Sequence, residues 1–170
     1  MKFSSTAVLF ATLASQIYAH TTGPWEIRPY DSESLVLTLE AVEDLTFQAI
    51  DASMSQRWLI LDNPNGPGSW VQNQETSRYI NCNFADFLCQ ESIHPQVWEV
   101  NRFDEDGTIS FVEPFSRRTI HRTHEGNRRL RLLPANGGYD DRYTLGQCKS
   151  SVWELVYGTI ILTFIFKGDL

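Results

Sequence analysis

Basic side chains are concentrated in one short stretch of the sequence, residues 117–131. This stretch holds six of the chain's fourteen Lys and Arg residues, together with His121 and His124. Guanidinium groups on neighbouring strands can bind an anion such as a sulfated sugar, a lipid phosphate or an acidic protein surface. The alternative is a solvated charged face, or a strand edge protected by charge. The residues of this candidate anion patch are Arg117, Arg118, Arg122, Arg128, Arg129 and Arg131.

Carboxylates are plentiful, but their contexts do not indicate catalysis. The acidic runs at 104–106 and 140–141 lie among turn-forming residues, where solvated acids are common. The sequence has no Gly-x-Ser-x-Gly motif, no phosphate-binding loop and no dinucleotide-binding fingerprint. We therefore expect a protein without enzymatic activity and without a cofactor.

The histidines and cysteines do not have the spacing of a structural zinc site. One alternative concerns His20, which would follow a signal peptide. Its α-amine and imidazole could then chelate copper together with a second histidine, in the manner of a histidine brace. The other histidines are His94, His121 and His124. A single terminal histidine is weak support, and we expect no metal site.

The composition indicates one ordinary globular domain. The chain has 170 residues, 42% of them hydrophobic, and a formal net charge of −7. This acidic balance disfavours nucleic acid as a partner, because phosphate binding depends on positive charge. An aromatic content of 12%, with five Trp, favours strands over a helical bundle.

The first nineteen residues have the pattern of a secretory signal peptide. Lys2 supplies a positive start, residues 7–13 form a short apolar segment, and residues 17–19 end in a plausible cleavage site. Cleavage after Ala19 would leave one extracellular domain, residues 20–170. We expect no membrane partner, because no apolar run is long enough to span a bilayer. The C-terminal run 159–166 has the composition of a buried strand.

Short runs rich in β-branched and aromatic residues alternate with turn clusters along the chain. Turn-forming residues gather at 63–68, 104–107 and 136–138. About a dozen short strands at this spacing predict an all-β sandwich or barrel. The expected strands are 35–40, 45–50, 58–61, 70–73, 79–82, 98–101, 108–112, 118–123, 128–133, 143–147, 153–157 and 159–166.

Three cysteines follow the expected cleavage site. Cys82 and Cys89 are seven residues apart and could face each other across a hairpin, forming a disulfide in an oxidising compartment. Cys148 would then be buried as a small hydrophobic residue or available for an intermolecular bond.

Three tryptophans begin similar short segments. The segments are Gln56-Arg57-Trp58, Gln96-Val97-Trp98 and Ser151-Val152-Trp153, and each has a polar residue two positions before the tryptophan. The first two tryptophans are 40 residues apart, and the third lies 55 residues further on. The order of strands and turns after the first tryptophan repeats after the second, which indicates an internal repeat.

A Gln-x-Trp repeat in an all-β chain of this length resembles the ricin B-type lectins, in the style of a secreted fungal member. The resemblance implies a β-trefoil of about twelve strands in three pseudo-symmetric units, with Trp58, Trp98 and Trp153 packed around the threefold axis. It places Trp25 in the second strand of the first unit, which the segment from Trp153 would close. It also implies that the two closely spaced cysteines bridge the third and fourth strands of the second unit.

In that family an Asp accepts bonds from sugar hydroxyls, an aromatic side chain stacks on the sugar, and polar residues before the Trp complete the pocket. The matching residues of the second unit are Asn81, Phe87 and Gln96. The first and third units have Thr38 and His121 at the Asp position and no clear aromatic, so at most one pocket is expected. The alternative is that the two amides bond backbone groups and that the ring belongs to the core.

The resulting hypothesis is a secreted, monomeric, non-catalytic module that binds a glycan. The alternative is a secreted effector or protease inhibitor of the same fold, which would bind a host protein through its loops. The surfaces available for that second function are the loop 62–69 and the extended segment 124–142.

Overall fold

Twelve short strands and one 3₁₀ turn make up the part of the chain that the computed structural model describes, residues 21–40, 44–123, 129–136 and 138–148. In this part no helix is long and apolar enough to cross a membrane. The elements are β1 (Thr21–Pro29), β2 (Leu35–Leu39), β3 (Leu45–Ala49), η1 (Met54–Gln56), β4 (Trp58–Asp62), β5 (Ser69–Asn73), β6 (Tyr79–Cys82), β7 (Cys89–Ser92), β8 (Glu99–Phe103), β9 (Thr108–Val112), β10 (Arg118–Arg122), β11 (Leu130–Pro134) and β12 (Tyr143–Gln147).

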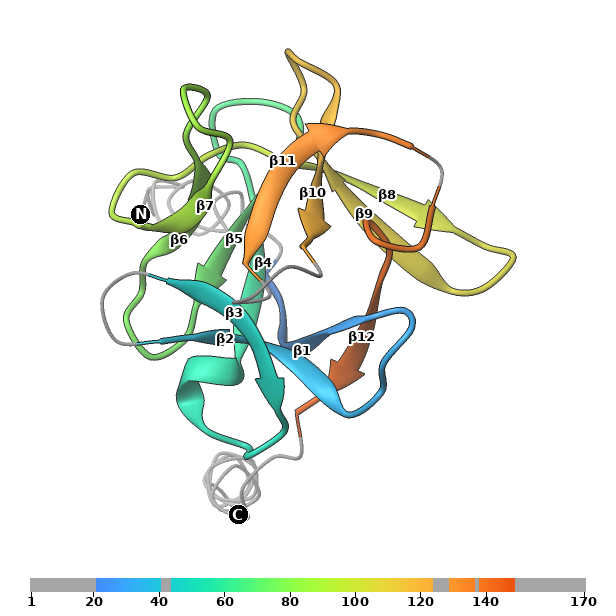
Figure 1. The fold of residues 1–170 in the computed structure, drawn as a ribbon. Helices are drawn as coiled ribbons and strands as arrows, with labels where there is room; N and C mark the ends of the chain where they lie inside the picture. Colours follow the sequence, from blue (N-terminus) through green and yellow to red (C-terminus); the bar gives the residue numbers. More distant parts are fainter. Residues whose placement is uncertain (1–20, 41–43, 124–128, 137, 149–170) are drawn as a thin grey trace, which may run out of the picture.

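Six of these strands close into a barrel (Figure 1). β1 pairs with both β4 and β12, β4 pairs with β5, and β9 pairs with both β8 and β12. Ser69 and Trp98 complete the circle between β5 and β8, because each backbone N–H donates to the other's carbonyl at 2.8 Å. A closed barrel leaves no long unpaired strand edge among these six strands.

The other six strands form three hairpins, β2–β3, β6–β7 and β10–β11. One isolated bridge joins each pair of hairpins, so that the three make a triangular cap. Barrel and cap together are a β-trefoil of three units, β1–β4, β5–β8 and β9–β12 (Figure 1). The bridges are Asp44 with Gln90, Thr46 with Arg129, and Leu88 with Arg131.

All three units contribute to one hydrophobic core. Alternation along the strands sends apolar residues inward, and each large side chain that is fully buried stabilises the fold by about 1.5–3 kcal/mol. The largest are Trp58, Trp98, Tyr143 and Phe111.

The all-β class and the trefoil expected from the Trp repeat are confirmed, but the expected division into units is wrong. Trp25 lies in β1, the first strand of its unit, and not in the second. β1 pairs with β12 along five residues, from Trp25 opposite Gln147 to Pro29 opposite Tyr143. Residues 143–147 are the last strand of the third unit, and their pairing with β1 joins the third unit to the first and closes the barrel. Trp153, the expected strands at 153–157 and 159–166 and the expected signal peptide lie outside the described residues.

Candidate functional site

Each unit sends one aromatic side chain with a polar hydrogen into the core. In each case that hydrogen is donated to the backbone carbonyl of a cap-hairpin residue at the same position in its unit. A buried N–H or O–H needs such a partner. The three units therefore share the same side-chain hydrogen bond as well as the same packing of an aromatic ring in the core. The bonds are Trp58 Nε1 to Leu37 O at 2.9 Å, Trp98 Nε1 to Ile80 O at 3.4 Å, and Tyr143 Oη to Ile120 O at 3.0 Å.

Tyr143 therefore holds the third aromatic position, which the sequence analysis assigned to Trp153. The third copy of the repeat reads Asp141-Arg142-Tyr143. Neither the Gln nor the Trp of the motif is kept, which is why the copy was missed. The spacing could have revealed it, because Tyr143 follows Trp98 by 45 residues, closer to the first interval of 40 than the 55 residues to Trp153.

In the first unit the polar side chains at the expected site position are buried and bonded to one another and to the backbone. Thr38 and Gln56 are both buried. The Gln56 side chain donates to Thr38 Oγ1 at 3.2 Å and to the Ala49 carbonyl at 2.9 Å, and it accepts the Asp51 N–H at 2.9 Å. These bonds use the polar groups internally, so none is presented to a ligand.

The third unit buries a small polar network at the same place. Thr119 Oγ1 lies 2.7 Å from His121 Nε2 and 3.2 Å from Asp141 Oδ2. Burial lowers the pKa of His121, and Asp141 and Asp140 oppose this shift only in part. The imidazole is therefore neutral at neutral pH, and as a buried group it is not available to a sugar.

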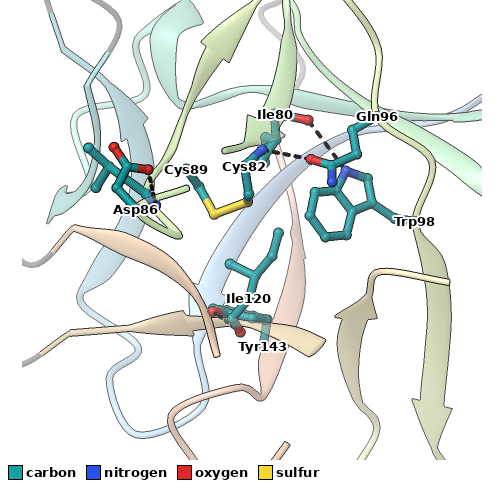
Figure 2. The surroundings of a disulfide bond; sticks show 9 residues. Ile80, Cys82, Asp86, Cys89, Gln96, Trp98, Ile120 and Tyr143 are labelled. Carbon is teal, nitrogen blue, oxygen red and sulfur yellow. Dashed lines mark hydrogen bonds between the residues drawn. A yellow bond between two sulfur atoms is a disulfide. The ribbon is translucent and has the colours of Figure 1, made fainter. Parts of the chain in front are cut away.

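Only the second unit leaves its polar pair partly exposed. Asn81 Nδ2 donates to the His94 carbonyl at 3.1 Å. Gln96 Oε1 accepts the Cys82 N–H at 2.6 Å, as Figure 2 shows. Asn81 Oδ1 and Gln96 Nε2 keep their hydrogen-bonding capacity. Both residues line an open pocket of about 400 Å³. The residues of this second-unit pocket are Asn81, Cys82, Asn83, Phe84, Pro95 and Gln96.

The aromatic side chain at this pocket is Phe84, whereas the sequence analysis selected Phe87. Phe84 is 51% exposed and lines the pocket. Phe87 is half-buried, packs against the core, and has the guanidinium carbon of Arg118 4.2 Å from its ring centroid. Asn81 and Gln96 thus come together as expected, but Phe87 does not line the pocket with them.

A disulfide holds the base of this pocket. Cys82 and Cys89 lie opposite each other in the β6–β7 ladder and are bridged, as expected (Figure 2). They join the second and third strands of the unit, not the third and fourth. Side-chain turns order the loop between them, because Asn83 accepts the Ala85 N–H at 2.9 Å and Asp86 accepts the Leu88 N–H at 3.0 Å. The cysteine bridge therefore tethers the loop that carries Phe84.

Cys148, the third cysteine, is half-buried and not bridged. Burial raises the pKa of its thiol.

The arginines of the candidate anion patch are spread over separate contacts. Arg131 is exposed, and Arg128 lies outside the described residues. The other four each contact a different acidic or aromatic side chain, and Arg122 and Arg129 pair with acids of the first unit. These two arginines therefore join the third unit to the first, rather than forming one anion site. The contacts are Arg117 with Glu99 at 2.5 Å, Arg118 with the Phe87 ring, Arg122 with Asp31, and Arg129 with Asp44 at 2.7 Å.

Within residues 21–40, 44–123, 129–136 and 138–148, no group of three His, Cys, Asp or Glu side chains is placed to hold a metal ion. His20 and His124 lie outside these ranges.

Comparison with known proteins gives similarity at the level of the fold. No protein-family model and no curated protein matches the sequence. A ricin B-like lectin of Macrolepiota procera, solved in complex with lactose, has a TM-score of 0.63 and 14% identity, over 78% of this chain and 99% of that one. The Rhizoctonia solani agglutinin has a TM-score of 0.63 and 12% identity, over 77% and 96%. SeviL, solved with the asialo-GM1 saccharide, has a TM-score of 0.57 and 13% identity, over 78% and 100%.

The chain therefore has the β-trefoil fold of ricin B-like lectins, in a strongly divergent sequence. The resemblance inferred from the Trp repeat is confirmed for the fold.

Proposed function

We propose that this protein is a secreted, non-catalytic, lectin-like module that binds a glycan through the second-unit pocket. One observation carries the proposal. Among the described residues of the three equivalent positions, only those of the second unit present a polar pair, Asn81 and Gln96, beside an exposed aromatic ring, Phe84. The lactose and asialo-GM1 complexes of proteins with the same fold support a glycan as the ligand class.

The pocket chemistry suits a neutral sugar. Asn81 Oδ1 can accept a bond from a hydroxyl, Gln96 Nε2 can donate one, and the Phe84 ring offers a face for the C–H side of the sugar. A neutral Asn provides a bond about half as strong as that of a charged Asp. We therefore expect weak binding at a single site that changes little with salt.

The test is a glycan array with the chain from His20, at low and at physiological salt. Phe84→Ala is expected to weaken binding about tenfold or more, because the variant loses the stacking face. Phe115→Ala is the matched control, since Phe115 is 95% exposed and lies outside the pocket. Equal binding by the Phe84 variant would exclude this pocket as the site.

A second candidate function, binding of a host protein by a secreted effector or inhibitor, is favoured by the presentation of Phe115. The buried Glu113 carboxylate accepts the N–H groups of Phe115 at 3.2 Å and Ser116 at 2.6 Å. Burial has the largest single effect on the pKa of Glu113 and raises it, but the hydrogen bonds from Ser116 and Phe115, together with the charge of Arg117, outweigh burial and keep this pKa below its usual range. A ring held on such a pre-organised turn is a suitable hot spot for a protein partner. No binding to any glycan would favour this function, and no inhibition across a protease panel would exclude its inhibitor form.

A further inference from the structure

Two exposed tyrosines from distant parts of the sequence stack on each other. The ring centroids of Tyr30 and Tyr139 are 4.9 Å apart, and the ring planes differ by 18°. Tyr30 follows the end of β1, and Tyr139 lies in the loop between β11 and β12, so the pair joins the first unit to the third. The two side chains are 37% and 62% exposed. A reagent in solution can therefore reach both rings.

Backbone hydrogen bonds hold the two tyrosines beside each other. The N–H of Tyr30 donates to the carbonyl of Arg142 at 3.0 Å, and the N–H of Arg142 donates to the carbonyl of Tyr139 at 3.2 Å. The adjoining residues belong to the ladder of β1 and β12, in which Pro29 lies opposite Tyr143. The backbones that carry the two rings are therefore tied to one and the same residue, Arg142.

A buried arginine ties the same two segments a second time. The guanidinium group of Arg122 pairs with Asp31, which follows Tyr30. Its backbone N–H donates to the carbonyl of Asp140, which follows Tyr139, at 3.0 Å. Because Arg122 is buried in the trefoil, it holds both segments to the body of the fold. Two groups held together in this way react as if they were present at a very high concentration.

Stacked phenols can be joined covalently by one-electron oxidation. A haem peroxidase that uses hydrogen peroxide removes one electron and one proton from each phenol, which leaves two phenoxyl radicals. The radicals combine through a new C–C bond between ring carbons next to the hydroxyl groups, and the hydrogen atoms on these carbons move to the oxygens. In the balance, two tyrosines and one hydrogen peroxide give one dityrosine and two waters. The peroxide is reduced and the two phenols are oxidised.

We propose that Tyr30 and Tyr139 form an intramolecular dityrosine bond when a peroxidase oxidises the folded protein. The bond closes most of the trefoil into one covalent loop, from the end of β1 to the loop before β12. Such a loop restricts the unfolded chain and so stabilises the folded one, as a disulfide does. This modification site goes beyond the function proposed above, because neither tyrosine lines the second-unit pocket.

The test treats the chain from His20 with a haem peroxidase and an equimolar amount of hydrogen peroxide. The protein is kept at about 1 μM, so that coupling within one molecule has the advantage over coupling between molecules. Peptide mapping by mass spectrometry is expected to find the peptides of Tyr30 and Tyr139 linked, with the loss of two hydrogen atoms. The linked monomer is expected to melt about 5 °C or more above the untreated protein.

Tyr30→Phe and Tyr139→Phe are each expected to lower the yield of dityrosine in the monomer about tenfold or more, because the remaining tyrosine loses its pre-positioned partner. Each variant removes only a hydroxyl from an exposed ring, so the fold is expected to stay intact. Tyr79→Phe is the matched control and is expected to keep the full yield. The ring of Tyr79 is half-buried and lies edge-on to that of Trp70, with centroids 5.7 Å apart.

Four results would overturn the proposal. They are no dityrosine in the protein under conditions that couple free tyrosine, dityrosine only in covalent dimers, linked peptides that join a different pair of tyrosines in the monomer, and an equal yield in the Tyr139→Phe variant.

Discussion

Tyr143 shows how one residue can keep a threefold position after its motif has been lost. Its ring lies 6.0 Å from that of Phe47 and 5.9 Å from that of Phe111, so the smaller aromatic side chain still packs against other rings in the core. Its hydroxyl bonds the Ile120 carbonyl as the indoles bond theirs. Burial raises the pKa of Tyr143 far above the usual range, so this hydroxyl remains a donor wherever the protein is folded.

The prediction at this scale concerns the Tyr143 hydroxyl. Tyr143→Phe is expected to lower the free energy of unfolding by about 1–3 kcal/mol, because the buried Ile120 carbonyl loses its side-chain donor. Urea denaturation followed by fluorescence measures the change. Tyr139→Phe is the control, since Tyr139 is 62% exposed and a surface change of this kind stays within about 0.5 kcal/mol. Equal losses in the two variants would show that the buried bond contributes nothing specific.

The sequence analysis selected two of the three residues that we assign to the proposed sugar pocket, and it selected a different phenylalanine as the third. Two phenylalanines lie between the bridged cysteines, and composition cannot tell which ring faces solvent. The backbone decides, because Phe87 has a φ of 59°, which is uncommon for a bulky residue and helps to direct its ring towards Arg118. Phe84 remains at the pocket. Which of the two phenylalanines lines the pocket depends on the backbone geometry of the loop, and this geometry cannot be predicted from the spacing of residues in the sequence.

At the scale of the elements, ten of the twelve described strands were expected, and the two missed ones have physical explanations. In β1 the Gly23–Pro24 pair interrupts the β-pattern, and the register with β4 shifts between Thr22 and Trp25. β7 reads Cys-Gln-Glu-Ser, which looks polar. Glu91 is nevertheless buried, because it accepts a bond from Thr76 and pairs with Arg78 at 3.7 Å. Because polar contacts with residues of a neighbouring turn stabilise this strand, its sequence lacks the alternation of apolar and polar residues by which strands are predicted.

The β6–β7 hairpin gives the prediction at this scale. Reduction of the Cys82–Cys89 bridge is expected to lower the free energy of unfolding by about 2–3 kcal/mol, because it frees a short loop in the unfolded chain. The comparison is urea denaturation with and without a reductant, in a Cys148→Ala background that leaves a single redox pair. The same treatment should weaken glycan binding, since the bridge tethers the Phe84 loop. Identical midpoints with and without the reductant would show that the cap hairpin is held by its strand pairing alone.

At the scale of the molecule, the trefoil is held closed by contacts between its first and third units. β1 and β12 share a full antiparallel ladder, and two ion pairs, Arg122 with Asp31 and Arg129 with Asp44, join the same two units. Arg122 is buried, so the loss of its partner would leave a charge poorly compensated. The basic stretch that the sequence analysis considered as an anion site thus contributes to joining the ends of the repeat.

The closure of the barrel predicts how much of the chain the fold requires. β12 ends at Gln147. Each of the six described barrel strands already has a neighbour on both sides, without any residue after Gln147. A chain of residues 20–148 is therefore expected to melt within about 3 °C of the chain 20–170, a difference of about 1 kcal/mol or less. A chain that stops at Arg142 lacks β12 and is expected to lose cooperative unfolding, which makes it the matched control. Differential scanning calorimetry compares the three. A large loss of stability on removing residues 149–170 would instead support the sequence interpretation in which the segment 159–166 is a buried strand of the core.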